Sequence, residues 1–112
     1  MDVYEKLRLN KEFKRAYGRG RSFVTPSFVA YIYIGKTKGL RLGLTTGKKL
    51  GNAVQRNRAR RVLTAAFRDN CADIVTDCDI VFVARHRILC KKSTEISAEM
   101  KKIFREAGIT GQ

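Results

Sequence analysis

The chain of 112 residues lacks tryptophan, has a single proline, and contains no uncharged apolar run longer than residues 28–34. Such a run is too short to span a bilayer, and the N-terminus has no apolar stretch resembling a signal peptide, so we expect neither secretion nor membrane insertion. The three cysteines, Cys71, Cys78 and Cys90, are odd in number and lack zinc-motif spacing. This favours reduced thiols and a cytoplasmic location. The length and composition predict one globular domain over residues 1–112.

Acidic residues are missing from one continuous half of the sequence. Lys and Arg number 24 against 10 Asp and Glu, giving a formal net charge of +14, and no Asp or Glu occurs from Phe13 to Arg68. The two flanking segments together hold as many basic as acidic residues, so the whole excess lies in this acid-free segment. A surface that is merely solvated mixes both signs, because like charges packed together destabilise a fold. Such an excess needs a polyanion as partner, either nucleic acid or an anionic membrane. For the acid-free segment we expect nucleic acid and no membrane.

Hydrophobic periodicity predicts an α+β domain with helices packed on a small sheet. Three stretches have helical spacing between capping residues: 10–20 with Asn10 as cap and Gly18 or Gly20 as stop, 52–69 with Asn52 as cap and Gln55 as its capping-box partner, and 93–108 with Ser93 or Thr94 as cap and Gly108 as stop. Four stretches are typical of strands: 22–24 at an edge, 28–34, 40–46 and a central 79–85. Residues 35–39 are expected to form a hairpin loop. Both faces of 28–34 are apolar or aromatic, so one face must be covered while the other is available to bind a ligand.

At 100° per residue, the helix that begins at Asn52 has a polar stripe separate from its apolar face. The stripe consists of Arg56, Asn57, Arg60, Arg61, Thr64 and Arg68. Arg58 lies on the remaining edge of the helix and must reach solvent by another route. Because guanidinium groups make bidentate contacts with phosphate oxygens, the stripe predicts a phosphate-binding surface. Lys48 and Lys49 add charge beside the helix start, but the glycines around them do not have the spacing of a nucleotide-binding P-loop.

Aromatic side chains accompany these cations. Phe13 and Tyr17 are four residues apart on the basic first helix, and Tyr31 lies on the face of its strand that has no obvious cover. Stacking on aromatic rings contributes about 1–3 kcal/mol per base and tolerates any sequence, which suits single-stranded RNA. The alternative is that the three rings are ordinary core residues, like Phe67 and Phe104.

Residues 48–61, with the sequence KKLGNAVQRNRARR, closely resemble the signature of the protein component of bacterial ribonuclease P. The match centres on the Arg-Asn-Arg core at Arg56–Arg58, and the resemblance covers nearly the whole chain. It implies an α-β-β-β-α-β-α sandwich with a small four-stranded sheet and a left-handed β-α-β crossover. Two positions depart from the family pattern: Thr64 stands where relatives often carry a basic residue, and Gly47 where they often carry Ser.

The resemblance also implies a function. In that family the protein is the small subunit of a ribonucleoprotein that cuts the 5′ leader from precursor tRNA, and the RNA subunit performs the hydrolysis with Mg²⁺. We therefore expect one protein per catalytic RNA, a cleft that holds the single-stranded leader, and neither a catalytic residue nor a metal ligand in this chain. By motif position, the RNA-binding residues are Lys48, Lys49, Asn52, Arg56, Asn57, Arg58, Arg60, Arg61 and Arg68, and the cleft aromatics are Phe13, Tyr17 and Tyr31.

Two other functions fit parts of the sequence. A ribosomal or other structural RNA-binding protein without a processing role would explain the charge but not the signature. A protein-only nuclease would need a metal site, for which Asp73, Asp77, Asp79 and the nearby His86 are candidates. We expect the aspartates instead to form an acidic loop before the strand that contains Ile80.

Overall fold

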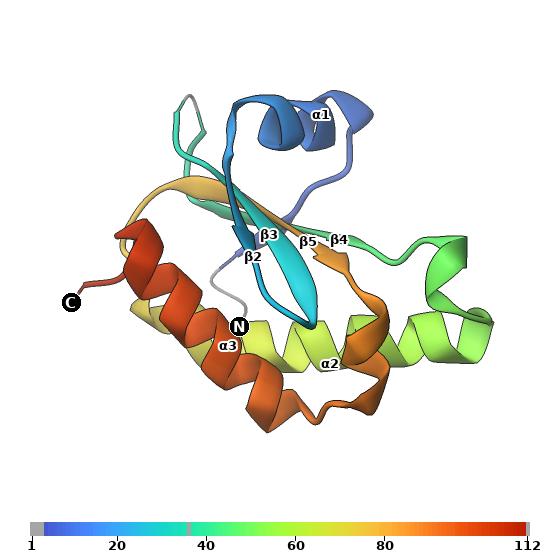
Figure 1. The fold of residues 1–112 in the computed structure, drawn as a ribbon. Helices are drawn as coiled ribbons and strands as arrows, with labels where there is room; N and C mark the ends of the chain where they lie inside the picture. The colour runs from blue at the N-terminus through green and yellow to red at the C-terminus, as the bar shows by residue number, and fades with distance from the viewer. Residues whose placement is uncertain (1–3, 36, 112) are drawn as a thin grey trace.

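The structure, a computed structural model, describes residues 4–35 and 37–111 and consists of a twisted five-stranded sheet between helices (Figure 1). Its elements follow in the order β1 (Glu5–Lys6), α1 (Asn10–Arg19), β2 (Arg21–Val24), β3 (Phe28–Tyr33), β4 (Leu40–Thr45), the 3-10 helix η1 (Lys48–Leu50), α2 (Ala53–Asn70), the 3-10 helix η2 (Cys71–Asp73), β5 (Cys78–Ala84), the 3-10 helix η3 (His86–Cys90) and α3 (Ser93–Ala107). No helix in the described residues is both long and apolar enough to cross a bilayer.

The strand order of the sheet is β1-β4-β5-β3-β2. β5 is central, as predicted, and pairs antiparallel with β3 and parallel with β4. The predicted hairpin between 28–34 and 40–46 is therefore wrong, because β5 lies between the two strands and buries both of its apolar faces there. β2 is an edge strand, as predicted. The short β1 pairs in parallel with β4, so the sheet has one strand more than the four expected.

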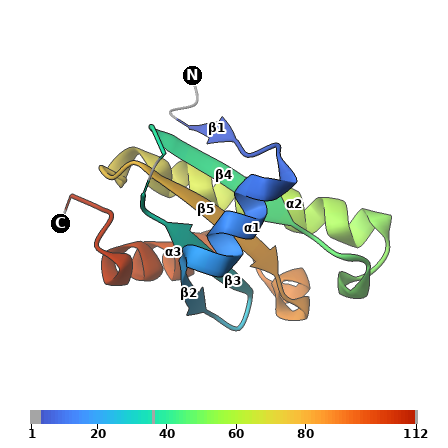
Figure 2. The same cartoon turned by 90° about the horizontal axis from the view of Figure 1, so that it is seen from above.

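The connection from β4 through α2 to β5 is a left-handed crossover. β4 and β5 are parallel neighbours, and α2 lies on the face of the sheet opposite α1. Seen from the α1 side, both strands run toward the same end of the sheet, and the chain returns beneath them along α2 (Figure 2). This hand, which the family resemblance implied, is the opposite of the usual preference for such units.

Helices cover both faces of the sheet: α1 lies on one face, and α2 and α3 lie on the other (Figures 1 and 2). β3 alternates as predicted, with Phe28, Ala30 and Ile32 buried in the larger core beneath the sheet and Tyr31 on the α1 side. Ile34 lies beyond the end of β3 and is 51% exposed, so it does not extend the apolar face as expected. The larger core contains four fully buried phenylalanines: Phe28, Phe67, Phe82 and Phe104.

The start of α2 is the predicted capping box. Asn52 Oδ1 accepts a hydrogen bond from the Gln55 backbone N–H at 2.9 Å, and Gln55 Oε1 accepts one from the Asn52 N–H at 2.8 Å. Gly108, with φ of 73°, ends α3 as predicted. The residues that form the start of α2 and the end of α3 lie only a few positions apart in the sequence. A local sequence pattern is therefore enough to predict these helix ends.

The caps predicted for the other two helices are wrong. Asn10 is the first residue of α1, and Ser93 and Thr94 lie inside the first turn of α3. In both helices the residue before the first turn makes no side-chain cap, and a glutamate of the first turn instead accepts a hydrogen bond from the backbone N–H of that residue. Glu12 Oε1 accepts from the backbone N–H of the residue before α1 at 3.0 Å, and Glu95 Oε1 accepts from that of the residue before α3 at 3.1 Å. A negative charge near a helix N-terminus also stabilises the helix dipole.

Candidate nucleic-acid interface

A groove lies between α1 and α2, with β4 along its floor. It consists of two adjoining hollows of about 330 and 470 Å³, and both are lined by Phe13 of α1, Leu44 of β4 and Arg60 of α2. We call it the ring groove, because Phe13 and Tyr17 line it from α1. The groove therefore places an aromatic wall from the first helix, formed by Phe13 and Tyr17, beside Arg60 of the signature helix.

Phe13 packs against β4 at Gly43, where the absence of a side chain leaves room for the ring. A Cβ atom added at Gly43 would lie 2.6 Å from Cε1 and 2.8 Å from Cζ of the Phe13 ring, so no other residue at this position leaves the ring where it is. Leu7 also approaches the same point, at 3.1 Å from the added atom. Gly43 was not among the predicted site residues, and only its place inside a strand marked it as unusual.

The two tyrosines extend the aromatic wall from Phe13. The Tyr17 and Tyr31 rings meet edge to face with centroids 5.0 Å apart, and the Phe13 and Tyr17 centroids are 6.5 Å apart. Tyr17 is 40% exposed, and its hydroxyl shares a 3.0 Å hydrogen bond with Thr45 Oγ1 across the groove. The structure thus brings the three predicted rings together, with Tyr17 exposed and with Phe13 and Tyr31 half-buried against the smaller core of Leu7, Ala16, Tyr33 and Val81. Their contact with RNA stays a prediction.

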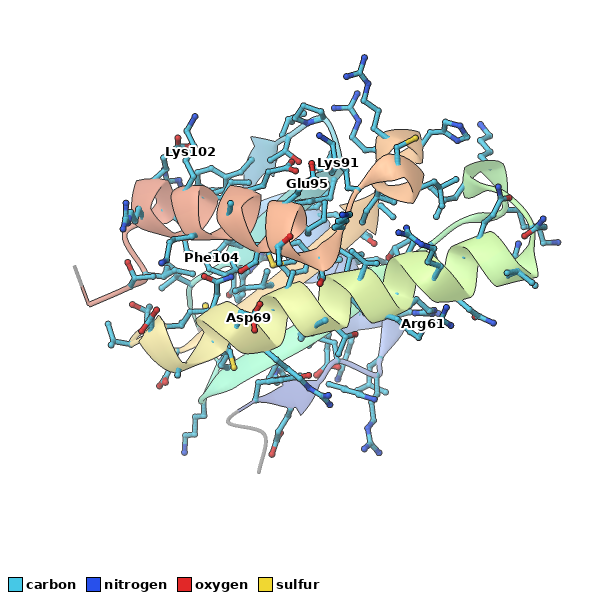
Figure 3. The ribbon with its side chains drawn as sticks, turned by 90° about the horizontal axis from the view of Figure 1, so that it is seen from below. Arg61, Asp69, Lys91, Glu95, Lys102 and Phe104 are labelled. Atoms are coloured by element: carbon cyan, nitrogen blue, oxygen red, sulfur yellow. The ribbon has the colours of Figure 1, made fainter. Side chains whose placement is uncertain are left out.

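The polar stripe of α2 divides into residues on the groove and residues facing solvent. Arg60 lines both hollows, and Thr64, which departs from the family pattern, lines the smaller one. Arg61 projects from the exposed surface of α2 (Figure 3). The other predicted arginines and asparagine of the stripe comprise the exposed Asn57 and Arg68 and the half-buried Arg56.

Arg58 leaves the helix in a different direction from the stripe. Its guanidinium donates hydrogen bonds to the backbone carbonyl oxygens of Leu89, at 3.3 Å, and Lys91, at 3.0 Å. Arg58 was expected to reach solvent from the helix edge, but its guanidinium is half-buried and bonded to these carbonyls instead. Arg58 therefore joins α2 to the segment that contains η3.

The remaining predicted RNA-binding residues surround the start of α2. Lys48 and Lys49 are exposed in η1, directly before the helix. Asn52 uses its side-chain oxygen to cap α2, which leaves its side-chain N–H groups as the part that could donate to RNA. Gly51 has a φ of 152°, and a Cβ there would collide with Gln55, so this glycine allows the tight entry into the capping box.

A buried carboxylate, which the sequence interpretation missed, fixes α1 on the sheet. Asp79 of β5 is fully buried and receives two hydrogen bonds from Arg41, at 2.7 and 2.8 Å. Arg15 of α1 donates a third at 3.0 Å, and Thr37 a fourth at 3.1 Å. Arg41 also contacts Glu12 of α1 at 2.6 Å. We call these five residues the Asp79 cluster. It ties α1, and with it the aromatic wall, to β4 and β5.

The Asp79 cluster keeps its charges at neutral pH. Burial alone would raise the pKa of Asp79, but the hydrogen bonds from Arg41 and Arg15 outweigh it and hold this pKa below its usual value. The hydrogen bonds that Arg41 donates to Asp79 likewise raise the pKa of Arg41. The pKa of Glu12 is lowered, chiefly by its hydrogen bond with the backbone N–H before α1. Two cations of the acid-free segment are therefore neutralised inside the protein.

The candidate nuclease residues do not gather into a site. Asp79 lies within β5, so the prediction of an acidic loop is wrong for this residue, whereas Asp77 is exposed before the strand and Asp73 lies in η2. Across residues 4–35 and 37–111, no three His, Cys, Asp or Glu side chains are placed to hold a metal ion. Burial, with help from neighbouring carboxylates, raises the pKa of Cys78 to about 12, so that thiol stays protonated and is a poor nucleophile.

Comparisons with known proteins identify relatives that match nearly the whole length of the chain. The family model described as Ribonuclease P matches residues 1–108. The chain is 35% identical to the ribonuclease P protein component of Clostridium novyi over 111 residues, covering 97% of this chain and 98% of the relative. It is 36% identical to that of Clostridium kluyveri, with the same coverage.

Solved structures agree with the sequence relatives. The RNase P protein of Staphylococcus aureus superposes with a TM-score of 0.81 at 29% identity, covering 95% of this chain and 97% of that one. The RNase P protein of Thermotoga maritima, at 24% identity and a TM-score of 0.78, shares the fold. The signature on α2, the fold and these relatives lead to one conclusion: the chain belongs to the family of bacterial ribonuclease P protein components.

Proposed function

We propose that the ring groove holds the single-stranded 5′ leader of precursor tRNA while the RNA subunit of ribonuclease P removes that leader by hydrolysis. The observation that carries this proposal is that Phe13, Tyr17 and Arg60 line a single groove, with Tyr31 in contact with Tyr17. Bases can stack on the rings while the guanidinium contacts a phosphate. Stacking is insensitive to sequence, which fits a segment that differs from one precursor to the next.

The chemistry of the chain's own groups supports a binding role. The buried carboxylate, Asp79, already accepts hydrogen bonds from two arginines and a threonine, so it offers no lone pair directed at a ligand. Among residues 4–35 and 37–111, no three His, Cys, Asp or Glu side chains are placed to hold a metal ion, and we propose that the Mg²⁺ of the holoenzyme is bound mainly by the RNA. On this proposal the chain acts as one RNA-binding domain over residues 1–112, with one copy per catalytic RNA in the cytoplasm.

Reconstitution tests the proposal. The protein alone should leave precursor tRNA intact, and the protein with the RNA subunit should cut it at the mature 5′ end at a Mg²⁺ concentration where the RNA alone is slow. Adding protein should tighten the binding of a precursor with a leader but not that of the same tRNA without one. Cleavage by the protein alone, or equal tightening for both tRNAs, would overturn the assignment.

Two variants of one residue test the groove itself. Tyr17→Ala removes a ring, whereas Tyr17→Phe keeps the ring and removes only the hydrogen bond with Thr45. We expect the alanine variant to bind a leader oligonucleotide more weakly, by up to about 1–3 kcal/mol, and the phenylalanine variant to stay close to wild type.

Co-purification distinguishes this function from the alternative. A structural RNA-binding protein without a processing role would co-purify with ribosomal particles rather than with one short RNA.

A further inference from the structure

A second basic surface lies on the side of α2 that faces away from the ring groove. Arg58 and Arg60 are two residues apart on the helix, so their side chains leave it about 160° apart. Arg60 lines the ring groove, whereas Arg58 bonds to the segment around η3. Seen from below, Lys91 of this segment and Arg61 lie on opposite sides of α2 (Figure 3).

The segment from 85 to 92 contains four Lys or Arg residues and no Asp or Glu: Arg85, Arg87, Lys91 and Lys92. All except Lys91 are exposed, and Lys91 is partly neutralised by Glu95 at 3.6 Å. The two segments that flank the acid-free segment have no net charge together, because acidic residues elsewhere in them balance this basic cluster. We call residues 85–92 the η3 surface.

The η3 surface is rigid before any partner binds. Ile88, at its centre, is fully buried in the core. Arg85 anchors one end, because its backbone N–H donates to Ser27 O and its guanidinium to Thr25 O, both at 2.9 Å. Arg58 fixes the other end through its two carbonyl contacts. The segment therefore presents its cations in a fixed arrangement, which lowers the entropy lost on binding.

We infer that the η3 surface binds the phosphate backbone of the folded RNA subunit, with Arg58 as a positioning residue, while the ring groove on the other side of α2 binds the leader. This inference rests on the proposed function. The segment contains no Phe, Tyr or Trp, and its one ring is the small imidazole of His86, so it offers mainly charge and little ring surface for an unpaired base to stack on. Charge without stacking suits the paired regions of a folded RNA, which proteins contact through phosphates and sugars.

A pair of double variants tests the surface. Arg87→Ala with Lys92→Ala removes two exposed cations from the η3 surface, and Lys101→Ala with Lys102→Ala removes two exposed cations from α3 as a control of equal net charge. Binding of the transcribed, folded RNA subunit and of a single-stranded leader oligonucleotide is measured over a range of salt. We expect the first variant to bind the RNA subunit several-fold more weakly. Its salt slope, the slope of the logarithm of the binding constant against the logarithm of the salt concentration, should be lower by about one unit for each lost contact. Its leader binding should match that of the control.

Arg58→Lys tests the positioning role, because it keeps the charge and loses the planar fork that reaches two carbonyls. We expect faster hydrogen exchange at the amides of η3 and weaker binding of the RNA subunit, with leader affinity unchanged. Unchanged subunit binding despite faster exchange would overturn the role of Arg58. Equal salt slopes for the two double variants would overturn the η3 surface. In either case wild-type binding and cleavage would persist, whereas failure of the proposed function would abolish them in the wild type.

Discussion

Asp79→Asn is the substitution from which we expect the largest effect on stability. The asparagine has the same shape but carries no charge, so Arg15 and Arg41 lose their buried counter-ion. Removing one partner of a buried ion pair costs about 3–5 kcal/mol. Because the side chains of Arg15 and Arg41 are 29% and 21% exposed, they can recover part of their hydration, and we expect about 3 kcal/mol, the lower end of that range. A domain has only about 5–15 kcal/mol of stability in total, so this loss is readily measured.

The pH dependence of the unfolding free energy tests whether the charge of Asp79 is responsible for the loss of stability. Its pKa in the folded state lies below that in the unfolded state, so its contribution is complete above the unfolded value of about 3.9 and is lost as the pH falls through the folded value. The difference in unfolding free energy between wild type and Asp79→Asn should therefore be constant from about pH 5 to 8 and shrink below about pH 4.

Urea unfolding at a series of pH values measures that difference. Asp77→Asn is the matched control, because it changes the net charge equally at an exposed position near the same strand. The cluster would have no stabilising role if the Asp79 variant lost less than about 1 kcal/mol at neutral pH, a loss within the range of ordinary substitutions. A difference that persisted undiminished into strong acid would show that the lost charge is not responsible and that the cost comes from replacing an acceptor oxygen with an amide NH₂ group that faces other donors.

Three further predictions concern the ring groove and the neighbouring, solvent-facing Arg61 of α2, each measured by fluorescence anisotropy with a leader oligonucleotide. Gly43→Ala should displace the Phe13 ring and weaken leader binding while binding of the RNA subunit stays unchanged. Tyr31→Ala should cost up to about 1–3 kcal/mol of leader affinity with little change in salt slope, because stacking releases few counterions. Arg60→Ala and Arg61→Ala should each lower that slope by about 0.7. Thermal unfolding should stay near wild type for both arginine variants, and unchanged slopes would remove α2 from the leader site.

The features that sequence predicts are those decided within one turn or one strand. The capping box at Asn52 involves a partner three residues away, and the i and i+4 spacing of Phe13 and Tyr17 already places both rings on one side of α1. The hairpin failed for the opposite reason. Residues 35–39 are compatible with a tight turn, but β5, some forty residues further on, pairs with both flanking strands and separates them.

Long-range pairing also explains the site residues that the sequence did not reveal. Asp79 stands in an apolar strand, and the cations that justify its burial come from positions 64 and 38 residues earlier in the chain. The angle of Arg58 on its helix showed that it leaves the polar stripe, but not that carbonyl oxygens 31 and 33 residues later receive it. Gly43 is needed because a ring from another helix lies against it.

The net charge of +14 overstates the number of phosphates that the chain can neutralise. The ion pairs of Arg15 and Arg41 in the Asp79 cluster are already subtracted in that figure, but Arg58 and Arg85 remain in it although their guanidinium groups donate to backbone carbonyls before any RNA arrives. Counterions are released only by cations that meet phosphates, at about 0.7 per contact on a single strand. The ring groove presents only part of the remaining cations. The logarithm of the leader binding constant should therefore fall with the logarithm of the salt concentration with a slope well below about 10, the value for fourteen contacts. A slope near that value would mean that the leader also crosses the η3 surface, and the division of the two RNAs by α2 would then be wrong.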